Sequence, residues 1–173
     1  MQDELSLEVA MEDAERGELD RKFAAEFFDE TWALLGLEER TKEQVERMIH
    51  SSHAALCHLY KAPGVGVKSL VKGYWQLCRV YAAAGQGVVA RTYAFRCMDE
   101  AKASGDPFLL TIACESLGRA AAVLGDAAER DRQSAQGMKY ASEILDPDVR
   151  AFCEDNLAAM PRTLGPGPSL PVF

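Results

Sequence analysis

The chain has 173 residues, of which 48% are hydrophobic and 27% charged, and its formal net charge is -8 at pH 7. This length supports one domain with its own core, and the composition is typical of a globular protein. The excess of acidic residues argues against nucleic acid or an anionic membrane as the main partner. We also expect no membrane-spanning helix, because no run is long and apolar enough.

Five cysteines fall within apolar helical patterns, at Cys57, Cys78, Cys97, Cys114 and Cys153. Their number is odd and none forms a Cys-x-x-Cys motif. We therefore interpret them as small buried hydrophobic residues in a reducing compartment. The N-terminus is acidic and lacks the apolar segment of a signal peptide. Together these features predict a cytoplasmic protein.

Residues 1–17 form the first predicted segment, an N-terminal arm or tail. Leu5, Leu7, Val9 and Met11 alternate with polar or small residues, which is the spacing of a β-strand. A lone strand in a helical protein needs a partner. We therefore interpret this segment as an arm, a frayed helix or a poorly tied terminus.

Residues 18–160 show helical periodicity and form the predicted domain. Its first helix ends at Gly36, and Thr41 with Gln44 predicts the capping box of a second helix. Further stop and start signals follow at Pro63-Gly64, Gly85, Ser104-Gly105, Asp106-Pro107, Gly125-Asp126 and Asp146-Pro147. Residues 161–173, with four prolines, form a predicted C-terminal tail. The prediction is an all-α fold of about seven helices in antiparallel pairs.

The domain repeats itself at a spacing of 40 residues. Residues 77–85 match residues 117–125, and Asp106-Pro107 matches Asp146-Pro147. A fixed period in this range indicates stacked helical hairpins. Such arrays present extended binding surfaces, so the repeat favours binding over catalysis.

An aromatic pair is followed by leucine, tyrosine, glycine, alanine and a small residue, at Tyr74-Trp75, Leu77, Tyr81, Gly85, Ala90 and Cys97. This series resembles the tetratricopeptide repeat. The second copy has Arg130 where that repeat has alanine, and both copies exceed the usual unit of about 34 residues. The resemblance covers about residues 70–145 and implies a right-handed array of helical pairs. Residues 28–124 are also similar to a bacterial family of small repeat proteins without an assigned activity.

The resemblance implies where a partner would bind, because the first helix of each tetratricopeptide pair lines a concave groove. The residues at these positions are Lys72, Trp75, Gln76, Arg79, Glu115 and Arg119. Arg79 and Arg119 are equivalent in the two copies, and two stacked guanidinium groups suit a carboxylate or an acidic peptide. The alternative is that both arginines pair with acids of neighbouring helices and that Trp75 belongs to the core.

All three histidines lie in one predicted helix, at His50, His53 and His58. Glu46, His50, His53 and Cys57 fall within an arc of about 60° on that helix. A carboxylate, two imidazoles and a thiol on one face are ligands that a transition metal accepts, given a further ligand from another helix. The alternative interpretation is that these histidines form hydrogen bonds across a helix interface.

No motif for a nucleophile, a phosphate loop or a dinucleotide is present. We therefore expect a non-enzymatic interaction module without a cofactor, whose partner is a protein or peptide, or a second copy of the chain. The alternative is a helical bundle that binds a metal or a small molecule around His50 and His53.

Overall fold

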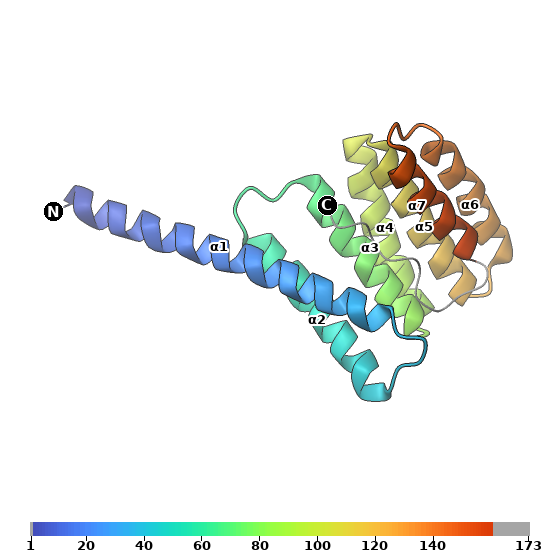
Figure 1. Cartoon of the computed structure of the whole chain (residues 1–173), viewed down its shortest axis with the longest axis horizontal. Coiled ribbons are helices and arrows are strands. Elements are labelled where there is room, and N and C mark those ends of the chain that lie inside the picture. Colours follow the sequence, from blue (N-terminus) through green and yellow to red (C-terminus); the bar gives the residue numbers. More distant parts are fainter. Residues whose placement is uncertain (1, 161–173) are drawn as a thin grey trace.

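The computed structural model of this chain describes residues 2–160, with side chains described from Asp13 onward (Figure 1). Within these residues it contains seven α-helices and no strand, which confirms the all-α prediction. The helices are α1 Gln2–Leu35, α2 Lys42–Lys61, α3 Val67–Ala83, α4 Gly87–Ser104, α5 Pro107–Val123, α6 Ala127–Ala141 and α7 Pro147–Ala159. The predicted tail at 161–173 lies outside the described residues.

Consecutive helices pack as antiparallel pairs, α1 with α2, α3 with α4 and α5 with α6. In the first pair, Asp20 of α1 is hydrogen-bonded to His58 of α2, and Glu30 of α1 accepts a hydrogen bond from Arg47 of α2. The residue number in α2 falls as that in α1 rises, so the two helices run in opposite directions. The final helix, α7, packs against both α5 and α6.

The predicted start and stop signals act as expected. Thr41 and Gln44 form a reciprocal capping box at the start of α2. At the start of α5, the Asp106 carboxylate accepts hydrogen bonds from the backbone N–H groups two and three residues further on. Asp146 accepts the equivalent two hydrogen bonds at the start of α7. Gly85 and Gly125 have φ angles of 73° and 78°, which suit a residue without Cβ. The repeat of 40 residues is therefore built into the turns and caps.

The structure differs from the prediction at the N-terminus. Residues 2–17 belong to α1, which runs without a break to Leu35, so the alternating residues lie in a helix although their spacing is that of a strand. A helix satisfies its backbone hydrogen bonds within itself, whereas a lone strand has no partner for them here. Helix α6 ends at Ala141, and Leu145, in the loop that follows it, is exposed.

The largest buried cluster lies between α3 and α5 and extends to α4 and α7. Its members include Trp75, Leu77, Leu109, Ile112 and Leu157. Polar and charged side chains are also buried among these helices, and they include most of the predicted groove residues.

Candidate functional site

Five of the six predicted groove residues are buried. Trp75, Gln76 and Arg79 lie on α3, and Glu115 and Arg119 lie on α5. The structure brings four of them together around the Glu115 carboxylate. This interior group, which we call the Glu115 cluster, consists of Trp75, Arg79, Glu115 and Arg119 with Trp32 of α1 and Asn156 of α7.

Three side chains donate hydrogen bonds to Glu115, whose exposed fraction is 1%. Trp75 Nε1 donates to Oε2 at 2.6 Å, Arg119 Nε donates to Oε1 at 2.6 Å, and Arg79 Nη2 donates to Oε1 at 3.1 Å. Burial alone raises the pKa of this carboxyl, but the two guanidinium charges and the hydrogen bonds from Arg119 and Trp75 outweigh it and leave the pKa lowered. Glu115 is therefore ionised at neutral pH.

Arg79 is held from two sides by aromatic rings. The guanidinium carbon lies 5.3 Å from the ring centroid of Trp32 and 5.0 Å from that of Trp75, within the range of a cation–π interaction. Its Nη2 also donates to Asn156. Burial lowers the pKa of Arg79 to about 10, against the opposing charge of Glu115, so the group stays charged at neutral pH.

Helices α1 and α7 close the predicted groove. Gln76 Nε2 donates to the carbonyl of Phe28 in α1 at 2.8 Å. Trp75 meets Phe152 of α7 in an edge contact with 6.3 Å between ring centroids. The alternative that both arginines pair with acids of neighbouring helices is confirmed for Arg79, which pairs with Glu115 of α5. Arg119 pairs with the same carboxylate, but from its own helix, one turn away. A partner would reach these side chains only after α1 or α7 moved away.

Lys72 is the one groove residue that the structure leaves partly exposed. Its Nζ lies 5.8 Å from the ring centroid of Phe108, and Lys68 Nζ lies 6.0 Å from the same ring. Burial and the charge of Lys68 lower the pKa of Lys72. The other five predicted groove residues are buried, so the predicted groove does not form one continuous exposed surface.

The histidines occupy three different environments. His53 is hydrogen-bonded to Tyr81 of α3 at 2.8 Å, and burial followed by the charge of His50 lowers its pKa. His58 is hydrogen-bonded to Asp20 at 2.6 Å and stacks on Phe27. For His53 and His58 this confirms the interpretation that they bond across a helix interface. Among the described residues no group of three or more His, Cys, Asp or Glu side chains is placed to hold a metal ion.

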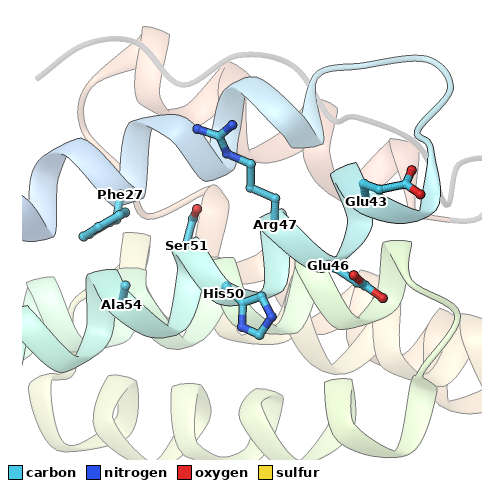
Figure 2. A pocket seen from close by; sticks show the side chains of 7 residues that line it. All are labelled: Phe27, Glu43, Glu46, Arg47, His50, Ser51 and Ala54. Carbon is cyan, nitrogen blue, oxygen red and sulfur yellow. The ribbon is translucent and has the colours of Figure 1, made fainter.

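His50 and Glu46 line a pocket of about 390 Å³ between α1 and α2 (Figure 2). Cys57 is exposed and is not among the residues that line this pocket. The remaining lining residues are Phe27, Glu43, Arg47, Ser51 and Ala54. Figure 2 shows Arg47 reaching from α2 toward α1, where its Nε donates to Glu30 Oε1 at 2.5 Å. Ser51 also donates to Glu30, at 2.7 Å. These bonds fix one wall of the pocket.

The sequence reasoning missed an exposed apolar surface on α1. Leu19 is 52% exposed and Phe23 38% exposed. Gly17 packs against Pro63, which follows α2, so closely that a Cβ at position 17 would lie 2.6 Å from the proline ring. Residues 13–16 are all exposed, and Figure 1 shows α1 continuing away from the other helices. Among the residues of α1 whose side chains are described, Gly17 is therefore the first that packs against the rest of the molecule.

Comparison with known protein families, with curated proteins and with solved structures found no match for this chain. In the part of the chain that the structure describes, no helix combines the length and apolar character needed to cross a membrane.

Proposed function

We propose that this chain is a non-enzymatic module that binds a protein or peptide partner, and that α1 presents the main binding surface. The observation that carries the proposal is the reach of α1 beyond its contact at Gly17. Residues 2–16 extend over about 22 Å at 1.5 Å per residue. An isolated helix of this length is marginal in water, so a packed partner would stabilise it. Leu19 and Phe23 supply exposed apolar area beside it.

The groove predicted from the repeat is a second route for the same function. Its use requires α1 or α7 to move, because both helices cover the Glu115 cluster. Lys72 is the groove residue that a partner reaches without such a movement, and a cation there suits the acidic peptide that we expected. The exposed free thiol of Cys57 suits a reducing compartment and supports a cytoplasmic location.

The experiment is capture of partners on immobilised chain, with three variants compared with the unaltered protein. We expect Leu19→Asp to lose the partner, because it places a charge on the exposed apolar surface of α1. Leu145→Asp is the matched control, since Leu145 is 94% exposed and lies in the loop before α7. Lys72→Glu reports on the groove. Equal capture by all variants would exclude both surfaces, and capture of nothing by any of them would overturn the proposed function.

The alternative of a small-molecule or metal site would use the pocket beside His50. It places an imidazole and the Glu46 carboxylate at one opening. Metal analysis of protein purified without a histidine tag separates this function from the first. Stoichiometric metal that His50→Ala removes would favour it, and metal-free protein would leave the interaction module as the better proposal.

A further inference from the structure

One stripe of α1 has the spacing of a coiled coil. Six positions follow one another at alternating intervals of four and three residues, and we call them the α1 seam: Leu5, Val9, Glu12, Arg16, Leu19 and Phe23. Alternating intervals of four and three define the a and d positions of a heptad repeat. Such positions share one face of a helix. The seam has two apolar positions at each end and two opposite charges in the middle.

The described part of the seam is accessible. Residues Gly17, Ala24 and Thr31 mark the buried side of α1, which faces the other helices. Leu19 and Phe23 lie on another side and keep 52% and 38% of their surface exposed. Phe23 contacts His58 of α2, with 5.3 Å between the ring centroids. The seam therefore runs beside the contact with α2 rather than beneath it.

We propose that two copies of this chain pair through the α1 seam in an antiparallel helix pair. A two-fold axis beside position 14 sets position 5 opposite 23, position 9 opposite 19, and position 12 opposite 16 of the second copy. Each a position then meets a d position, apolar residues meet apolar residues in four layers, and Glu12 meets Arg16 in the two central layers. The inference rests on the proposed function and names its partner.

The central charges set the direction of pairing. In a parallel pair with the same register, Glu12 would face Glu12 and Arg16 would face Arg16, which is unfavourable. In the antiparallel pair both layers join opposite charges. At the flanking positions, Glu8 faces Lys22 of the second copy, whereas Asp13 and Glu15 each approach their own symmetry mates. The apolar layers must therefore supply the affinity, and the central charges the register.

The arrangement leaves room for both molecules. Position 17, where α1 begins to pack against its own helices, lies level with position 11 of the second copy along the helix axis. Each set of packed helices consequently lies beside the far end of the other copy's α1. Figure 1 shows no other helix in that region of the molecule. The pair joins the two molecules through their first helices alone.

The test is sedimentation equilibrium of the full chain over a range of concentrations. We expect the unaltered protein to dimerise. Glu12→Arg and Arg16→Glu should each weaken dimerisation at least about tenfold, because like charges then meet in both central layers. An equimolar mixture of these two variants should form a heterodimer, since every central layer again joins opposite charges. The mixture restores opposite charges between the chains, while each helix keeps two like charges at positions 12 and 16.

Glu18→Arg is the matched control. It reverses a charge on the same helix at a heptad position outside the seam, where Glu18 is exposed, and it should leave dimerisation unchanged. A monomeric unaltered protein, an unpaired mixture, or equal weakening by the control would each overturn the inference. A monomer that still captures another protein through Leu19 would overturn this inference and leave the proposed function standing.

Discussion

At the scale of single residues, the Glu115 cluster shows how a charged side chain can be part of a core. Glu115 lies between two guanidinium groups, and all three are buried. We expect Glu115→Gln to lower the free energy of unfolding by about 3–5 kcal/mol, because two buried cations lose this negative charge. Urea unfolding followed by circular dichroism measures the change. Glu143→Gln, at an exposed position, is the control and should change it by less than about 0.5 kcal/mol.

The lowered pKa of Glu115 predicts that the stability of the protein depends on pH. The pKa of Glu115 is lower in the folded chain than its ordinary value of 4.5, so the folded state binds this proton less readily than the unfolded state. The resulting stabilisation is fully present above about pH 4.5 and is lost as the pH falls through the lowered pKa. Unfolding measured at several pH values should show that the free energy of unfolding of Glu115→Gln falls less steeply below about pH 4.5 than that of the unaltered protein. An equally steep fall in both proteins would show that the Glu115 carboxyl does not cause the loss of stability at low pH.

At the scale of helices, the repeat predicts equal contributions from equivalent caps. Asp106 and Asp146 accept the same two backbone hydrogen bonds at the starts of α5 and α7. Replacing either with alanine should lower the free energy of unfolding by about 1 kcal/mol. Chemical unfolding of the two variants checks this. Asp99→Ala, at an exposed position of α4, is the control. Unequal costs would mean that α7 is not part of the cooperative unit that contains α5.

Local signals made most helix boundaries predictable, since Thr41 and the two aspartates act through bonds within one turn. The burial of Arg79 was not predictable from the same information. It depends on Trp32 and Asn156, which lie 47 and 77 residues away in sequence. The α1 seam was readable in the sequence, but Leu5 and Val9 also belong to the alternating series with Leu7 and Met11, whose spacing fits a strand. Only the backbone of the structure, which is helical, decides between the period of a helix and that of a strand.

At the scale of the whole molecule, the closed groove can be tested through its thiols. The chain has five free cysteines, of which Cys57 is exposed and Cys78, Cys97, Cys114 and Cys153 are buried. Burial raises the pKa of Cys78 and of Cys153 to about 12, so neither forms the reactive thiolate at neutral pH. Native protein should therefore react with a thiol reagent rapidly at one site, and Cys57→Ser should abolish that fast phase.

The slow phase reports whether the groove opens. Cys153 lies on α7 and Cys78 on α3, so the departure of α7 alone would expose Cys153 without unfolding α3. If α7 and α3 form one cooperative unit, both thiols react at the rate of global unfolding, and mass spectrometry of the labelled peptides should show equal labelling. Faster labelling of Cys153 would contradict that expectation. It would show that α7 leaves the Glu115 cluster in the native protein, and that the groove is open to a partner for part of the time.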